Sequence, residues 1–348
     1  MVRWSILASD FYSGVRYFIS TTMYKKRLGI LLSLFITPGV VITLLAWGFW
    51  GHQQINRAAV FTLPPEMFGF YKEHIQFVTE HAVDPDKRRY ADPEEAARHF
   101  IDLDRYGDHP FDSLPLRWND AVKKYGEDSL KAHGIVPWHV LVMLNRLTRA
   151  FKEHDRERIL RYSADLGHYI GDAHVPLHCT RNYNGQLSGQ HGIHGFWESR
   201  LPELYGDAYE KITGRAEYIE NPSEVIWNVL RQSYAAHDSV LKIEKALSQQ
   251  FPPDKKYSYE ERGGQLVKVF SAGYSEAYHK ALNGMVERRL YAAIHTVGSF
   301  WYTAWVNAGM PSIDYQGEFI LSTTAKAELD SLNLRYNNRS GDIQGHQD

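Results

Sequence analysis

The sequence predicts an all-helical protein, folded as a single multi-helix domain that follows an N-terminal signal segment. Apolar residues recur at helical spacing along most of the chain after Trp47, and runs of alternating β-branched residues are missing. Neither an internal repeat nor an obvious linker divides this region. The chain has 348 residues, of which 44% are hydrophobic, and this is enough to bury a sizeable core.

The first 46 residues have the pattern of an export signal. A basic cluster, Lys25–Arg27, precedes an uncharged stretch, residues 28–46, and Trp47 follows its final alanine. A basic region, an apolar region and a small residue at the cleavage point make up a signal peptide. We therefore expect cleavage between Ala46 and Trp47, and a protein that is periplasmic or secreted. The alternative is a membrane anchor formed by residues 28–46, which the Pro-Gly pair in its middle disfavours.

The remaining chain is expected to be helical in nine segments: residues 52–62, 65–80, 115–131, 137–152, 155–174, 191–205, 222–248, 259–284 and 286–307. Pro137 is suited to the first turn of its helix, and Asp155 is a good N-cap. Residues 290–308 are uncharged and long enough for a second membrane span. His295 and the small and aromatic residues around it favour a buried helix instead.

These features divide the chain into three parts. Residues 1–46 form the extension and signal peptide, and residues 47–320 form the helical domain. Residues 321–348 are polar, so we expect a disordered tail.

The composition limits the kind of site that this chain can build. Its formal net charge of −2 does not suggest a protein that binds duplex nucleic acid through a basic surface. Cys179 is the single cysteine, which excludes an intrachain disulfide and a thiolate-rich metal site. A metal site would have to use histidine and carboxylate ligands, which suit zinc or manganese.

Such ligands are concentrated between residues 168 and 198. His168 and Asp172 lie four residues apart in a strongly helical stretch, and His194 and Glu198 repeat that spacing. Residues four apart share one face of a helix, so the two side chains of each pair can bind one metal ion. His178 follows a proline between the two pairs. Ordinary structural roles rarely account for three imidazoles and two carboxylates so close together, so this constellation predicts a metal site.

Two upstream ligands and one supporting residue are harder to choose. Asp84 and His99 are candidates, although spacing alone does not prefer Asp84 over Asp86. Spacing likewise does not prefer His99 over the acidic residues that follow it. Asp165 lies three residues before His168 and could accept the second ring N–H of that histidine.

Three motifs resemble zinc-dependent phospholipases C and the related single-strand-specific zinc nucleases. HYIGDAHVPLH, from His168 to His178, resembles their H-Y-x-G-D-x-x-x-P-x-H element, and HGIHGFWE resembles their H-x-x-x-(E/D) element. WGFWGH, which begins at Trp47, resembles their mature N-terminus, where a first-residue tryptophan binds metal through its α-amino group and carbonyl oxygen. The resemblance extends from Trp47 to about Gly309.

The resemblance implies the helical fold of these enzymes and a centre of three zinc ions. One ion would be held by Asp84, His99, His168 and Asp172. The second would be held by His178, His194 and Glu198, and the third by Trp47, His52 and the other oxygen of Asp172. Asp84 would also be catalytic, because its counterpart is thought to orient or deprotonate the attacking water. Asp172 would bridge two ions.

The implied activity is hydrolysis of a phosphodiester by metal-activated water, on a phospholipid head group or on single-stranded nucleic acid. The spacing from Trp47 to His52 resembles the nucleases, whereas Glu198 resembles the phospholipases C. The single cysteine also departs from the disulfide-bearing nucleases, so a phospholipase-C-like enzyme is preferred and a nuclease is the alternative. A non-catalytic, metal-binding helical surface protein is the alternative of another class. No stable protein partner is implied, and transient contact with a membrane surface is compatible with a lipid substrate.

Overall fold

The computed structural model describes residues 46–262, 264–315, 317–338 and 346, with side chains from Phe49 onward. The predicted signal segment and its alternative as an anchor lie outside the described residues, except for Ala46. Helices dominate the described part of the chain, so the helical class is confirmed in its coarse form. None of the described helices is long and apolar enough to cross a bilayer.

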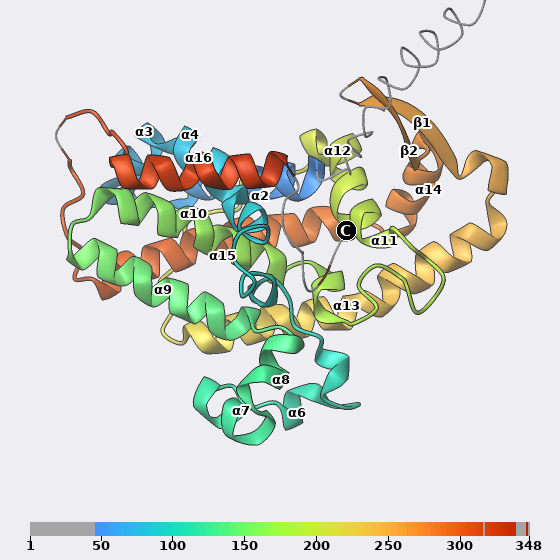
Figure 1. Ribbon diagram of the computed structural model, residues 1–348, viewed down its shortest axis with the longest axis horizontal. Helices are drawn as coiled ribbons and strands as arrows, with labels where there is room; N and C mark the ends of the chain where they lie inside the picture. Colours follow the sequence, from blue (N-terminus) through green and yellow to red (C-terminus); the bar gives the residue numbers. More distant parts are fainter. Residues whose placement is uncertain (1–45, 263, 316, 339–345, 347–348) are drawn as a thin grey trace, which may run out of the picture. The chain divides into compact units, whose positions relative to one another are not determined.

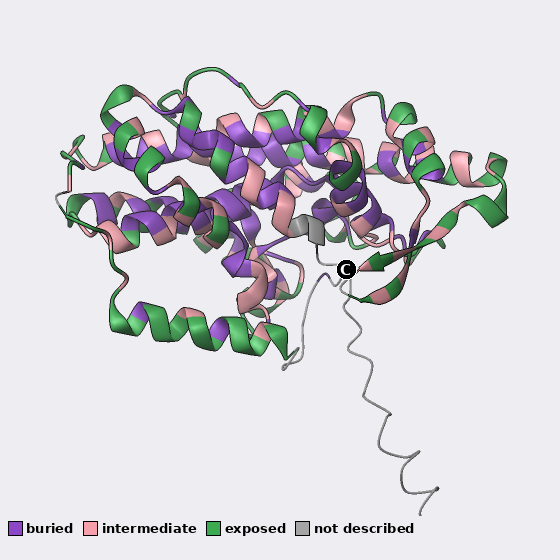
Figure 2. Ribbon diagram, turned by 90° about the horizontal axis from the view of Figure 1, so that it is seen from above, coloured by how far each residue is buried: buried purple, intermediate pink, exposed green. Residues whose placement is uncertain are grey.

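Five long helices build the core. α10 contacts each of the other four, and α2 and α9 both also contact α15 (Figure 1). Buried residues are concentrated where these helices face one another (Figure 2). The five are α2 (Ala46–Ala59), α9 (Val136–Lys152), α10 (Arg156–Ala173), α13 (Pro222–Gln250) and α15 (Met285–Asn307).

Shorter helices surround this core. They are α3 (Pro65–Glu73), α4 (Ile75–Glu80), α5 (Asp84–Arg88), α6 (Pro110–Ser113), α7 (Trp118–Tyr125), α8 (Glu127–Ala132), α11 (Ile193–Gly195), α12 (Leu201–Tyr205), α14 (Ala272–Ala281) and α16 (Thr323–Asn337). Single 3₁₀ turns connect several of them, and the turn η6 (Phe196–Arg200) between α11 and α12 is a π-helix.

The residues expected to begin helices α10 and α9 do lie at their first turns. The Asp155 side chain accepts a hydrogen bond from the Arg158 amide at 3.0 Å and so caps α10. Pro137 lies in the first turn of α9. Residues 290–308 form most of α15, whose Phe300 and Trp301 are completely buried. The interpretation of this stretch as a core helix is therefore confirmed.

The expected helix over residues 259–284 is wrong in its first half. Residues there form an antiparallel hairpin of β1 (Tyr257–Arg262) and β2 (Gln265–Phe270), followed by α14. The pairing of Arg262 with Gln265 leaves a two-residue Gly-Gly connection, which favours a tight hairpin turn. The Phe270 ring stacks on Phe196 at 3.9 Å, so the hairpin braces the π-turn.

The expectation that residues 321–348 lack structure is also wrong in part. Residues 323–337 form α16, which the Ser322 side chain caps by accepting from the Ala325 amide at 3.2 Å. α16 packs against α5, and Arg161 of α10 contacts Glu328 at 2.9 Å. This helix buries few apolar residues, so its sequence shows little hydrophobic periodicity, which is why the sequence did not predict it.

Candidate metal centre

α10 brings His168 and Asp172 to one buried face. Their exposed fractions are 0% and 1%, and His168 Nε2 lies 3.2 Å from Asp172 Oδ2. The two residues therefore lie on the same helix face, as their spacing of four residues predicts. A buried carboxylate needs positive charge or hydrogen-bond donors around it, which makes this face the natural centre of a site.

Two glycines let α2 approach this face closely. A Cβ atom on Gly171 would lie 2.9 Å from His52 Nδ1, and one on Gly167 would lie 1.9 Å from Asn56 Oδ1. Asn56 donates to the carbonyl oxygens of Val78 and Ala164, both at 3.1 Å, and fixes α2 there. His52 consequently stacks on His168, with ring centroids 3.9 Å apart.

The first group of ligands is His99, His168 and Asp172. His99 Nδ1 lies 3.0 Å from His168 Nε2 and 3.0 Å from Asp172 Oδ2. The other ring nitrogen of His99 faces Glu95 Oε1 at 3.5 Å. Three ligand atoms from distant parts of the chain thus surround one point.

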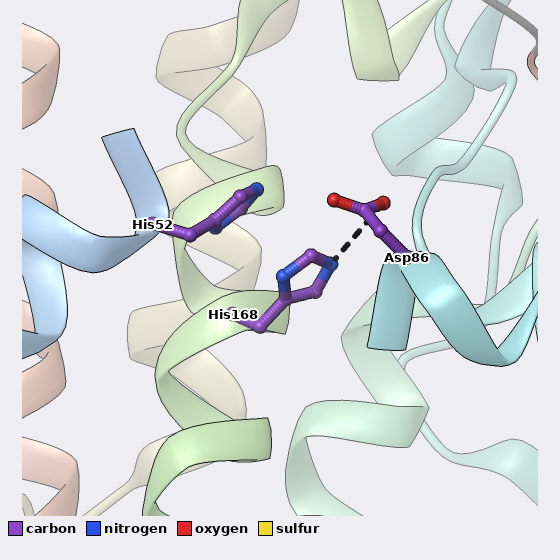
Figure 3. A group of neighbouring side chains, drawn as sticks. All are labelled: His52, Asp86 and His168. Atoms are coloured by element: carbon purple, nitrogen blue, oxygen red, sulfur yellow. Dashed lines mark ion pairs between the residues drawn. The ribbon is translucent and has the colours of Figure 1, made fainter. Parts of the chain in front are cut away.

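Asp86 rather than Asp84 reaches this group. Asp86 Oδ1 lies 3.8 Å from both His99 Nδ1 and His168 Nε2, and it forms a potential metal-binding group with His52 and His168. Figure 3 shows these three side chains pointing toward one another from α2, α5 and α10. Asp84 instead pairs with His81 at 2.6 Å and Lys87 at 3.1 Å.

Among the described residues, the structure thus brings Asp86 rather than the predicted ligand Asp84 into a potential metal-binding group, and the catalytic role expected for Asp84 stays a prediction. Both lie in the single short helix α5, where two residues correspond to about 200° of rotation. The two carboxylates must then point in nearly opposite directions, and only that of Asp86 points to His99 and His168. The Asp84 carboxylate lines a groove beneath α16 with Arg88 and Arg335.

The second group is His178, His194 and Glu198. Glu198 Oε2 lies 2.7 Å from His194 Nε2 and 3.3 Å from His178 Nε2. Glu198 sits in the π-turn η6, a wider helical turn that is often found at functional sites. Asn184 Oδ1 accepts the amide of Gly192 at 2.8 Å and fixes the loop that precedes His194.

A third group joins the first two. It consists of His52, Asp172 and Glu198, and His52 Nε2 lies 3.3 Å from Asp172 Oδ1. Trp47 belongs to the first turns of α2, five residues before His52, but its side chain and the chain before Ala46 lie outside the described part. The ligand role expected for the amine of Trp47 therefore stays a prediction.

These groups fit zinc by donor type and by spacing. Zinc bound tetrahedrally at about 2.0–2.1 Å requires ligand atoms roughly 3.3 Å apart. The separations in the first group are 3.0–3.2 Å, and in the third group His52 Nε2 lies 3.3 Å from Asp172 Oδ1. Asp172 Oδ2 is buried and accepts no hydrogen bond, although ring nitrogens of His99 and His168 lie 3.0 Å and 3.2 Å from it, as expected for three atoms that face one cation.

Backbone carbonyls orient two of the imidazoles. His168 Nδ1 donates to the Ala82 carbonyl at 2.8 Å, and His178 Nδ1 donates to the His99 carbonyl at 2.7 Å. Each contact places the ring proton on Nδ1 and leaves Nε2 to bind metal. Asp165, the predicted acceptor for His168, pairs with Arg88 at 2.9 Å instead.

The buried carboxylates of the cluster attract positive charge. Burial opposes the charged form of His168, but the carboxylates of Asp172 and Asp86 and the hydrogen bonds of the ring together outweigh it and raise the pKa of His168 to about 9. Burial would raise the pKa of Glu198, yet the imidazoles of His194 and His178 hold it below its usual range. The carboxylates thus draw cations to this site, either as protons on imidazole or as metal ions.

An aromatic slot adjoins the second group. The rings of Phe100 and Tyr183 lie on opposite faces of the His346 imidazole, and His346 Nε2 contacts Asp102 Oδ1 at 2.8 Å. Burial and the neighbouring Asp104 raise the pKa of Asp102 to about 7. The Ile101 amide donates to the His178 carbonyl at 2.9 Å, which connects the slot to a candidate ligand of the second group.

The structure therefore brings together seven of the residues predicted as ligands: His52, His99, His168, Asp172, His178, His194 and Glu198. Sequence reasoning left Asp86 open as an alternative but chose Asp84, and it missed the slot. The pair Phe100 and Asp102 directly follows His99, and this closeness was the available signal. In comparisons with protein-family models and with curated proteins, the chain matches none.

Proposed function

We propose that this protein is a zinc-dependent phosphodiester hydrolase whose metal centre is built on Asp172. The observation that supports this most strongly is the overlap of the buried ligand groups. Asp172 belongs to the first and third groups, and Glu198 belongs to the second and third. Ions held by overlapping groups lie close together, and closely spaced ions suit the two oxygens exchanged in phosphodiester cleavage.

Zinc bound there would supply Lewis acidity and a nucleophilic water at neutral pH. The protein's own contribution is orientation. The carbonyls of Ala82 and His99 hold the rings of His168 and His178 in the tautomer that ligates, and the surrounding core excludes bulk water. His52, which stacks on His168, is held by the close packing of α2 on α10.

Asp86 is the candidate proton acceptor. Its Oδ1 lies 3.8 Å from ring nitrogens of His99 and His168, beside the first ligand group but beyond direct hydrogen-bond distance. Its side chain is 20% exposed, whereas those of Asp172 and Glu198 are 2% and 10% exposed. We propose that Asp86 orients the attacking water and takes its proton, the role predicted for Asp84.

The aromatic slot favours a nucleic acid substrate over a phospholipid. The imidazole of His346 stands in for a planar heteroaromatic ring between Phe100 and Tyr183, with Asp102 at its polar edge. A nucleobase offers both a stacking face and an N–H donor, and base stacking contributes about 1–3 kcal/mol. A phospholipid head group offers no such ring. Among the phosphodiester hydrolases, we therefore favour cleavage of single-stranded nucleic acid over phospholipase-C-like activity, because the aromatic slot supports it.

The test is a substrate panel on zinc-loaded protein. Bis-p-nitrophenyl phosphate, phosphatidylcholine vesicles and single-stranded DNA would each be assayed, with chelator and then with added zinc. We expect turnover that the chelator abolishes and zinc restores, with DNA the best substrate. Turnover of phosphatidylcholine alone would overturn the preference for nucleic acid. Bound zinc without turnover of any substrate would support the non-catalytic metal-binding alternative.

The same proposal includes export. A ligand role for the amine of Trp47 requires cleavage after Ala46, since an amide nitrogen is a poor zinc ligand. We propose a periplasmic or secreted enzyme without a stable protein partner, whose contact with membranes is at most transient. N-terminal sequencing of mature protein tests this, and an N-terminus other than Trp47 would remove that ligand.

A further inference from the structure

His346 is held as tightly as a bound ligand. It is 5% exposed, and its ring lies 3.9 Å from the Phe100 ring and 3.9 Å from the Tyr183 ring. The interplanar angles are 18° and 10°, so the three rings form a nearly parallel stack. Both faces of the imidazole are thus covered by aromatic rings in the offset-stacked range of distances.

Polar contacts complete the fit. His346 Nε2–H donates to Asp102 Oδ1 at 2.8 Å, and the Arg89 guanidinium donates to the His346 carbonyl oxygen. The ring centroid lies 6.1 Å from that of His178, a predicted zinc ligand. His346 therefore occupies space directly beside the second ligand group.

We propose that His346 is a tethered inhibitor, which fills the aromatic slot and must leave before a substrate base can enter. This rests on the proposed function, since it takes the slot as the place where a substrate ring stacks. A tethered group competes at an effective concentration of the order of millimolar. Occupancy of about 90–99% would raise the apparent KM by roughly 10–100-fold without changing kcat, because only the free fraction binds substrate.

A binding experiment tests the slot without any turnover. A fluorescent peptide with the sequence of residues 339–348 would be titrated, by anisotropy, against full-length His346→Ala and wild-type protein. We expect at least tenfold tighter binding to the variant, whose slot is empty, and loss of binding when the peptide's own histidine is replaced by alanine. His109→Ala removes an exposed histidine and should bind the peptide as the wild type does. Equal affinity for His346→Ala and wild type would overturn the proposal.

Kinetics on single-stranded DNA provide the second readout. His346→Ala should lower KM at least tenfold with kcat unchanged, whereas His109→Ala should change neither. A fall in kcat with unchanged KM would overturn the proposal, because it would assign His346 to the catalytic machinery. If the peptide binds as expected but no phosphodiester is cleaved, the slot and its occupant stand while the proposed function fails.

Discussion

Replacing Gly171 by alanine tests how the metal centre depends on helix packing. The new methyl group would lie 2.9 Å from Nδ1 and 3.1 Å from Cε1 of His52. Ordinary contact between such atoms begins near 3.5 Å, so the imidazole must move by roughly 0.5 Å. Zinc sites tolerate ligand displacements of only about 0.2 Å, so His52 would no longer ligate well.

The expected magnitudes separate metal binding from folding. Alanine in a helix interior stabilises by about 1 kcal/mol relative to glycine, whereas overpacking costs about 1–3 kcal/mol. The metal-free variant should therefore lose no more than about 2 kcal/mol of its free energy of unfolding. Zinc affinity at the site that includes His52 should fall roughly 10–100-fold, as it does when a ligand loses its orientation.

Gly69→Ala is the matched control. Gly69 lies in α3, and an added Cβ would meet no atom within 4 Å. The free energy of unfolding of this variant should rise by about 0.5–1 kcal/mol, and it should bind zinc as the wild type does. The assays are urea unfolding in chelator and zinc titration against a chromophoric competitor. Unchanged zinc binding in Gly171→Ala would refute the claim that this glycine positions His52.

Three further predictions concern single side chains. Asp86→Asn should lower kcat by about 10²–10⁴-fold with zinc still bound, whereas Asp84→Asn should lower it far less; equal losses in steady-state assays would contradict the exchange of their roles. Asp172→Asn should reduce bound zinc, measured by metal analysis, more than His194→Ala does. Asp172 belongs to two potential metal-binding groups, whereas His194 belongs to one. Burial lowers the pKa of His139 to about 3, so the unfolded chain takes up a proton below pH 6.5 and the folded protein does not. Between pH 7 and pH 5 the wild type should then lose about 2 kcal/mol more unfolding free energy than His139→Gln, and equal losses in urea titrations would show that His139 is not held neutral.

The parts of the fold that were predictable are those that local chemistry determines. α10 begins after the Asp155 cap and carries His168 and Asp172 on one face, as its periodicity requires. The i,i+4 pair of His194 and Glu198 was predicted for the same reason, although Glu198 lies in a π-turn that follows the short helix of His194. Short-range spacing therefore located most of the candidate ligands.

The parts that were missed depend on contacts between distant segments. The choice between Asp84 and Asp86 depends on which side of α5 faces His99 and His168, and no local pattern encodes that rotation. β1 and β2 pair through backbone hydrogen bonds and were read as helix, because their exposed strands lack continuous β-branched runs. His346 reaches its slot across about 240 residues of sequence, a distance over which spacing gives no information.

The central claim is that buried ligands around Asp172 hold several zinc ions at once. The most direct measurement is the zinc content per chain of mature protein, determined by elemental mass spectrometry after dialysis against buffer with micromolar free zinc. We expect about three zinc ions per chain, falling below two in Asp172→Asn. Mature protein that retains no zinc under these conditions would contradict it.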